Sequence, residues 1–104
     1  MLVRFTSKSA ASVSMFEKDA TNLLKLMGHS GTIPSAIRAG DVADRLATLE
    51  KALKGDVSEY EEPAKEDEEP PVPINRRAYP LVELLRTAIA TDESVMWDYE
   101  RGAF

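Results

Sequence analysis

The stretch MLVRFTSKSAASVSMFEKDATNLLKLMG, residues 1–28, contains the two patterns that decide the fold class. At its start Val3 and Phe5 fall on one side of an extended chain and polar residues fall on the other, which predicts a short strand over 2–7. Its second half changes to helical spacing, because one helix face collects the apolar residues Phe16, Ala20, Leu23, Leu24 and Met27. A strand followed by an amphipathic helix predicts an α+β fold.

Both ends of this first helix are marked in the sequence. Ser14 and Glu17 have the spacing of a capping box, in which each side chain satisfies a free amide of the first turn, so we expect the helix to begin at Met15. Gly28 can adopt the left-handed conformation that commonly ends a helix. The residues that follow, 29–40, are rich in glycine, serine and proline and favour a loop, in which Ile33 and Ile37 could be held to the core as extended residues.

Two further helices are expected. Apolar residues at positions 42, 46, 49 and 53 keep helical spacing between Asp41, a capping residue, and Gly55. The third helix is expected over 79–91, where an apolar run begins at Leu81. Its start is placed there because Pro80 is tolerated only within a first helical turn, where its missing amide would be unpaired in any case.

The C-terminal segment has a second strand pattern. Val95, Trp97 and Tyr99 alternate with other residues, and the backbone groups of a strand need a partner, which we expect to be the N-terminal strand. The sequence therefore predicts an α+β fold in which three helices pack with a small two-stranded antiparallel ribbon formed by the N- and C-terminal segments. With 104 residues the chain is expected to form a single small domain, 1–104.

Residues 56–73 interrupt this domain with an acidic segment that contains four prolines. Between Gly55 and Pro71 there are eight acidic residues and one basic residue, which leaves 12 basic and 10 acidic residues elsewhere. Such a segment cannot bury enough apolar surface to offset an ordering cost of about 1–2 kcal/mol per residue. We therefore expect a flexible linker, a long disordered loop between the second and third helices.

The composition argues against several classes of function. Because the chain has no cysteine, it forms no disulfide, thiolate nucleophile or cysteine metal site. The nearly neutral remainder offers no concentrated basic face, so we expect neither nucleic acid nor a membrane as partner. No apolar run approaches the roughly 18 residues that span a bilayer, and the N-terminus lacks a signal-peptide pattern, so a cytoplasmic location is expected.

The candidates for catalysis and metal binding are weak. His29 stands in a Gly-His-Ser-Gly context just beyond a helix, where a proton shuttle or a metal ligand could be exposed. A histidine near a helix C-terminus also interacts favourably with the last carbonyls, and a metal site needs further ligands that no spacing here supplies. We therefore expect no catalytic residue, no metal and no cofactor.

Two groups of residues are left as candidate sites. Arg76, Arg77 and Tyr79, at the start of the third helix, could hold a phosphate, a carboxylate or an acidic partner segment. The alternative is an ion pair with the chain's own acidic segment. Trp97 and Tyr99 are candidate interface anchors, because both residue types are enriched at binding hot spots. Equally, these residues can close the core of a small domain, and for Trp97 we favour that interpretation.

Several short segments also follow one another in a recognisable order and spacing, at residues 1–5, 15–16, 37–39, 77–81 and 95–97. Taken in this order they resemble a bacterial family known as domain of unknown function 1840. The resemblance covers nearly the whole chain apart from the acidic segment. It implies no activity, cofactor or partner, and it supplies no functional residues to carry over.

The leading hypothesis is a non-enzymatic protein-protein interaction module. A two-stranded ribbon leaves two free edges, so a strand edge or the region of Trp97 and Tyr99 is expected to meet another chain, either a second copy in a homodimer or another protein. The alternative is a small anionic-ligand binding protein or minor enzyme that uses Arg76, Arg77 and Tyr79.

Overall fold

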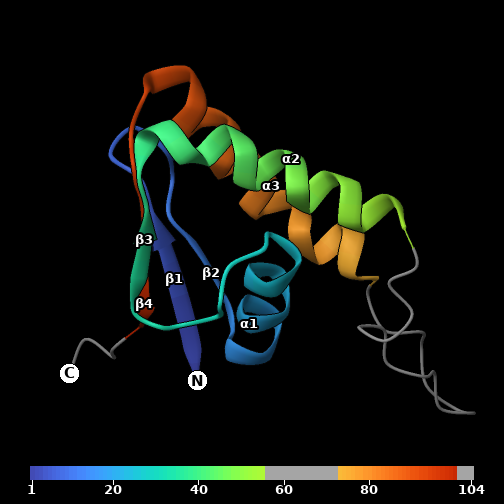
Figure 1. Ribbon diagram of the computed structural model, residues 1–104. Helices are drawn as coiled ribbons and strands as arrows, with labels where there is room; N and C mark the ends of the chain where they lie inside the picture. Colours follow the sequence, from blue (N-terminus) through green and yellow to red (C-terminus); the bar gives the residue numbers. More distant parts are fainter. Residues whose placement is uncertain (56–72, 101–104) are drawn as a thin grey trace, which may run out of the picture.

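The order of elements in the computed structural model, which describes residues 1–55 and 73–100, is that of an α+β fold (Figure 1). The described residues form β1 (Leu2–Thr6), β2 (Val13–Phe16), α1 (Glu17–Leu26), β3 (Ser35–Ile37), α2 (Val42–Lys54), α3 (Ile74–Thr91) and β4 (Val95–Tyr99). A short 3₁₀ turn, Ala39–Asp41, leads into α2. The predicted acidic linker lies outside the described residues except for Pro73, which precedes α3.

The strands form one antiparallel sheet in the order β2-β1-β4-β3. The predicted pairing of the two chain ends is confirmed, because Phe5 of β1 lies opposite Trp97 of β4. The prediction of a two-stranded ribbon is wrong, since β2 joins the outer side of β1 and β3 joins the outer side of β4. The N- and C-terminal strands are thus the centre of a four-stranded sheet.

The predicted capping box at Ser14 and Glu17 is also wrong. Ser14 lies in the β1–β2 ladder opposite Arg4, and α1 begins at Glu17. The amide of Glu17 donates a 2.8 Å hydrogen bond to the carbonyl of Met1, so β1 satisfies a helix-start amide that the capping box would have satisfied. Phe16 consequently ends a strand with 68% of its side chain exposed, and does not join the buried face of the helix.

Two other boundaries differ from those expected. Residues 29–40 were expected to form a loop, but they contain the strand β3; the expectation that Ile37 is extended and held to the core is confirmed, because Ile37 is buried opposite Val95. Helix α3 begins at Ile74, and Pro80 lies in its second turn. The early start follows from burial: Ile74 and Ala78 are fully buried at i and i+4, so they extend the apolar stripe toward the N-terminus.

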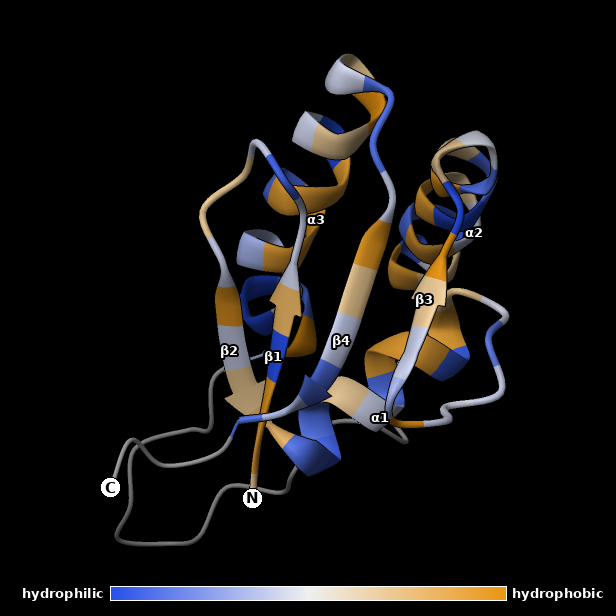
Figure 2. Cartoon of the chain, turned by 90° about the vertical axis from the view of Figure 1, so that its left-hand side faces the viewer, coloured by the Kyte–Doolittle hydropathy of each residue, from blue (hydrophilic) through white to orange (hydrophobic). Residues whose placement is uncertain are grey.

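All three helices cover the same face of the sheet (Figure 2). The inward residues of the central strands, Val3, Phe5, Val95 and Trp97, are 0–2% exposed. They meet the buried faces of the helices, which include Leu23, Leu24, Leu46, Leu49, Leu81 and Leu85. The helices α2 and α3 pack against each other and are joined at the surface by an ion pair between Glu50 and Arg86. The opposite face of the sheet carries no helix in the described part of the chain.

Candidate interaction surface

Exposed apolar side chains lie on the open face of the sheet. Leu2, Phe16 and Met96 point to this face and are 40, 68 and 53% exposed. Leu2 and Phe16 lie opposite each other on β1 and β2, so their side chains are neighbours. Figure 2 looks onto this face and shows β2 and β3 as its two outer strands.

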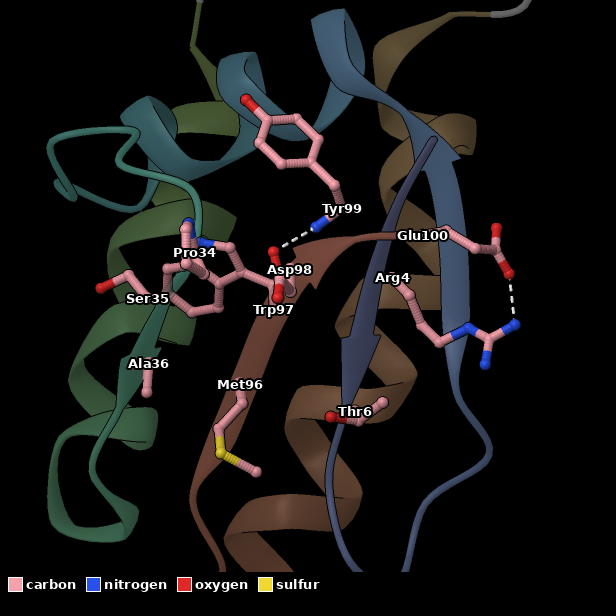
Figure 3. A pocket seen from close by; sticks show the side chains of 10 residues that line it. All are labelled: Arg4, Thr6, Pro34, Ser35, Ala36, Met96, Trp97, Asp98, Tyr99 and Glu100. Atoms are coloured by element: carbon pink, nitrogen blue, oxygen red, sulfur yellow. Dashed lines mark hydrogen bonds and ion pairs between the residues drawn. The ribbon is translucent and has the colours of Figure 1, made fainter. Parts of the chain in front are cut away.

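A shallow groove of about 620 Å³ crosses the open face over β1, β4 and β3 (Figure 3). Its apolar lining includes Met96 and Pro34. Its charged groups are already engaged within the chain, because Arg4 forms an ion pair with Glu100. The carboxylate of Asp98 accepts a 2.7 Å hydrogen bond from the backbone N–H of Tyr99. The groove therefore offers an apolar floor with internally paired charges.

Trp97 lines this groove, yet its side chain belongs to the core. It is 2% exposed, and its indole N–H donates a 2.9 Å hydrogen bond to the carbonyl of Thr32. Its ring lies 5.6 Å from the ring of Phe5 and 5.0 Å from that of His29, measured between centroids. The arrangement is that of a core aromatic with a satisfied donor.

Tyr99 connects the sheet to α1. Its hydroxyl donates a 2.6 Å hydrogen bond to the carboxylate of Glu17. This bond favours the neutral phenol and, together with burial, raises the pKa of Tyr99 above its ordinary value of 10.0. The hydroxyl of Tyr99 is therefore already used inside the chain.

The ring of His29 lies nearly perpendicular to that of Trp97, at an interplanar angle of 81°. Nδ1 accepts a 3.0 Å hydrogen bond from the backbone N–H of Gly31, and Nε2 lies 3.4 Å from the hydroxyl of Ser35. Burial, aided by the nearby Arg45 guanidinium, lowers the pKa of His29 below 6.5, so the ring is neutral at pH 7. No group of three or more metal-ligating side chains occurs in residues 1–55 and 73–100.

The predicted anion site is divided between two sides of α3. Arg77 forms an ion pair with Asp19 of α1, and their side chains are only 20% and 16% exposed. Arg76 is exposed, and Tyr79 is 63% exposed at the i+3 position beside it. The structure therefore brings Arg76 and Tyr79 together on the surface and turns Arg77 toward α1. The alternative that we considered is an ion pair between the arginines and the acidic segment. The residues of that segment lie outside the described ranges.

The two edges of the sheet differ in their protection. Strand β3 is three residues long, and it is preceded by Pro34, which has no N–H, and followed by the charged Arg38. Strand β2 and the residues before it, 9–16, contain neither charge nor proline. Natural edge strands are usually shielded against pairing with other chains by short length, charge or proline. By charge and proline, β3 is shielded and β2 is not, within the part of the chain that the structure describes.

Along β2, the N–H and C=O groups of successive residues point alternately toward β1 and toward the open edge. The amide of Glu17 bonds to the carbonyl of Met1, so the backbone groups of Glu17 point toward the neighbouring strand. Because this direction repeats every second residue, the N–H and C=O groups of Val13 and Met15 also point toward β1. The N–H and C=O groups of Ser14 and Phe16 therefore point outward. Sequence reasoning missed this edge because it assigned Met15 and Phe16 to the helix. The local signal is weak, because only Ser14 separates the apolar Val13 and Met15, and the apolar Phe16 breaks the alternation.

Comparison with known proteins adds a family and no relative of known activity. A family model described as "Domain of unknown function (DUF1840)" matches residues 1–97. No curated protein and no solved structure matches the chain. None of the described helices is long and apolar enough to cross a bilayer.

Proposed function

Because the chain belongs to the DUF1840 family, whose function is unknown, we propose a function from its own surface: it is a protein-protein interaction module that binds a second copy of itself. The observation that carries the proposal is the unshielded edge of β2, which adjoins the exposed side chains of Phe16 and Leu2. An edge of this kind is a template for strand pairing, and apolar side chains beside it gain from burial.

The distribution of charge favours a second copy as the partner. Residues 9–16 carry no charge, and the nearest charge on the open face, Arg4, is paired with Glu100. A strongly charged partner would find no complementary group there, whereas two copies of a neutral strip meet without like-charge repulsion. Self-pairing of one patch is also the commonest form of assembly, an isologous two-fold dimer.

Two polar groups that would suit catalysis, the His29 ring and the Tyr99 hydroxyl, are engaged in contacts within the fold. His29 contacts Gly31 and Trp97, and the Tyr99 hydroxyl bonds to Glu17. These contacts favour an interaction module over an enzyme. A second candidate, anion binding at the start of α3, has less support because Arg77 is already paired with Asp19.

Sedimentation velocity of the full chain over a wide range of concentrations tests the proposal. We expect the weight-average mass to rise with concentration from that of one chain toward that of two. The mass of a single chain throughout the range would contradict the proposal. A mass above two chains that grows without limit would also contradict it, because an isologous contact closes at two.

A further inference from the structure

The outward backbone groups of β2 limit how a second copy can pair with it. In an antiparallel pair, hydrogen bonds form only between residues whose N–H and C=O groups both point into the gap. On β2 those are Ser14 and Phe16, and we extend the same alternation by one residue, to Ser12, which directly precedes the strand. A two-fold register must therefore place even-numbered residues opposite even-numbered residues.

Of the registers that satisfy this condition, one uses every outward residue. When the two-fold axis passes through Ser14, this residue lies opposite the partner's Ser14. Ser12 then lies opposite the partner's Phe16, and Phe16 lies opposite the partner's Ser12. A centre at Met15 leaves Ser12 opposite residue 18, which lies inside α1. A centre at Val13 places Phe16 opposite Ala10, whose N–H already bonds to the carbonyl of Ser7 at 3.2 Å.

We infer that β2 pairs antiparallel with β2 of a second copy about a two-fold axis at Ser14, so that the two sheets join into one of eight strands. The inference rests on the proposed self-association and specifies its interface. Shielding of the β3 edge by Pro34 and Arg38 explains why the assembly closes at two chains.

The side chains of β2 agree with this register on both faces of the sheet. On the helix side, Val13 and Met15 are half-buried and pack against the core. The register sets Val13 opposite the partner's Met15, so the apolar layer continues across the boundary. On the open face, Ser14 meets the partner's Ser14, and two small hydroxyl side chains fit without steric conflict or repulsion.

A single introduced cysteine tests the register, because the natural sequence has none. Facing Cα atoms of a hydrogen-bonded antiparallel pair are about 5.5 Å apart, within the roughly 4.4–6.8 Å that a disulfide spans. On oxidation with diamide, Ser14→Cys is expected to convert most of the chain to a covalent dimer on a non-reducing gel. The matched control is Ala36→Cys, which places an exposed cysteine on β3, at the other edge of the same face. It is expected to stay largely uncrosslinked.

Lysine at the same two positions supplies an independent readout by sedimentation. Ser14→Lys places like charges opposite each other at the axis and is expected to give a monomer, whereas Ala36→Lys is expected to associate as the natural chain does. A natural chain that dimerises while Ser14→Cys fails to crosslink, or while Ser14→Lys stays dimeric, would overturn the β2 register and leave self-association standing. A natural chain that is monomeric at all concentrations would overturn both.

Discussion

Ser14 of β2 lies opposite Arg4 of β1, and the N–H and C=O groups of Ser14 point away from β1, toward the open edge of the sheet. The relationship follows from the alternation of an antiparallel ladder, which is fixed here by the bond between the Glu17 amide and the Met1 carbonyl. Among residues 1–55 and 73–100, the outer edge of β2 therefore has no strand partner for its backbone donors and acceptors, and residues 9–16 carry no charge. The proposed association and its register both depend on this edge.

Replacement of Phe16 by lysine is expected to weaken association. Phe16 is 68% exposed in the single chain and lies at the edge that a partner would cover. Loss of its burial, at about 1.5 kcal/mol, corresponds to roughly a tenfold higher dissociation constant. Sedimentation equilibrium measures this constant. The control is Met96→Lys, an exposed residue of the same face on β4, and an equal weakening by both variants would count against the β2 edge.

Replacement of Arg77 by alanine is expected to lower stability, and replacement of the neighbouring Arg76 is not. Arg77→Ala leaves the Asp19 carboxylate, which is 16% exposed, without this ion-pair partner between α1 and α3. The expected loss is about 1–3 kcal/mol in the free energy of unfolding, measured by urea denaturation. Arg76 is exposed, and Arg76→Ala should stay within about 0.5 kcal/mol of the natural chain. Equal stability of the two variants would refute the structural role of Arg77.

Stability is expected to fall on mild acidification because of His29. In the folded chain, burial and the nearby Arg45 lower the pKa of His29 below its ordinary value of 6.5. Near and below pH 6.5 the unfolded chain therefore binds a proton at His29 that the folded chain does not bind. The free energy of unfolding therefore decreases as the pH falls through 6.5, and this contribution levels off below the folded pKa. Urea denaturation at a series of pH values, followed by the fluorescence of the single tryptophan, measures it. His29→Gln should flatten the dependence in this range, and an unchanged slope would contradict the assignment.

Tyr99 is expected to ionise at higher pH than an ordinary phenol. Its hydrogen bond to Glu17 raises the pKa of Tyr99 above 10.0, so the stabilisation is present below pH 10 and is lost as the pH rises through the folded value. Absorbance titration of the three tyrosines should show a late phase that disappears in Tyr99→Phe. Glu17→Gln should shift that phase toward lower pH. A late phase that is unaffected by either change would show that it belongs to another group.

The central strands and the helix cores could be predicted from the sequence because their periodicity is strong. Val3 and Phe5 alternate clearly, and Leu46 and Leu49 keep helical spacing, so β1, β4 and α2 are where the pattern places them. The prediction failed where a tertiary contact outweighs a local signal. Ser14 and Glu17 match a capping box, but the carbonyl of Met1 satisfies the Glu17 amide, and Ser14 can then remain in a strand.

The candidate site was harder to predict than the fold. An edge is defined by the absence of a neighbouring strand, and neither β2 nor the three-residue β3 stands out in the sequence. Trp97 was a candidate anchor by residue type, and the favoured interpretation, that it closes the core, is confirmed by its bond to Thr32 and its contact with Phe5. The bond to Thr32 depends on the position of residues 32–37, which the sequence pattern did not fix.

Amide hydrogen exchange, followed residue by residue by NMR, tests the β2 pairing most directly. At a concentration where the chain associates, we predict slow exchange at Ser14 and Phe16, whose amides point outward, as well as at Met15, whose amide faces β1. The amide of Ala36, on the outward side of the β3 edge, should exchange fast and serves as the internal control. Fast exchange at Ser14 and Phe16 beside a protected Met15 would contradict the pairing of β2 with a second copy.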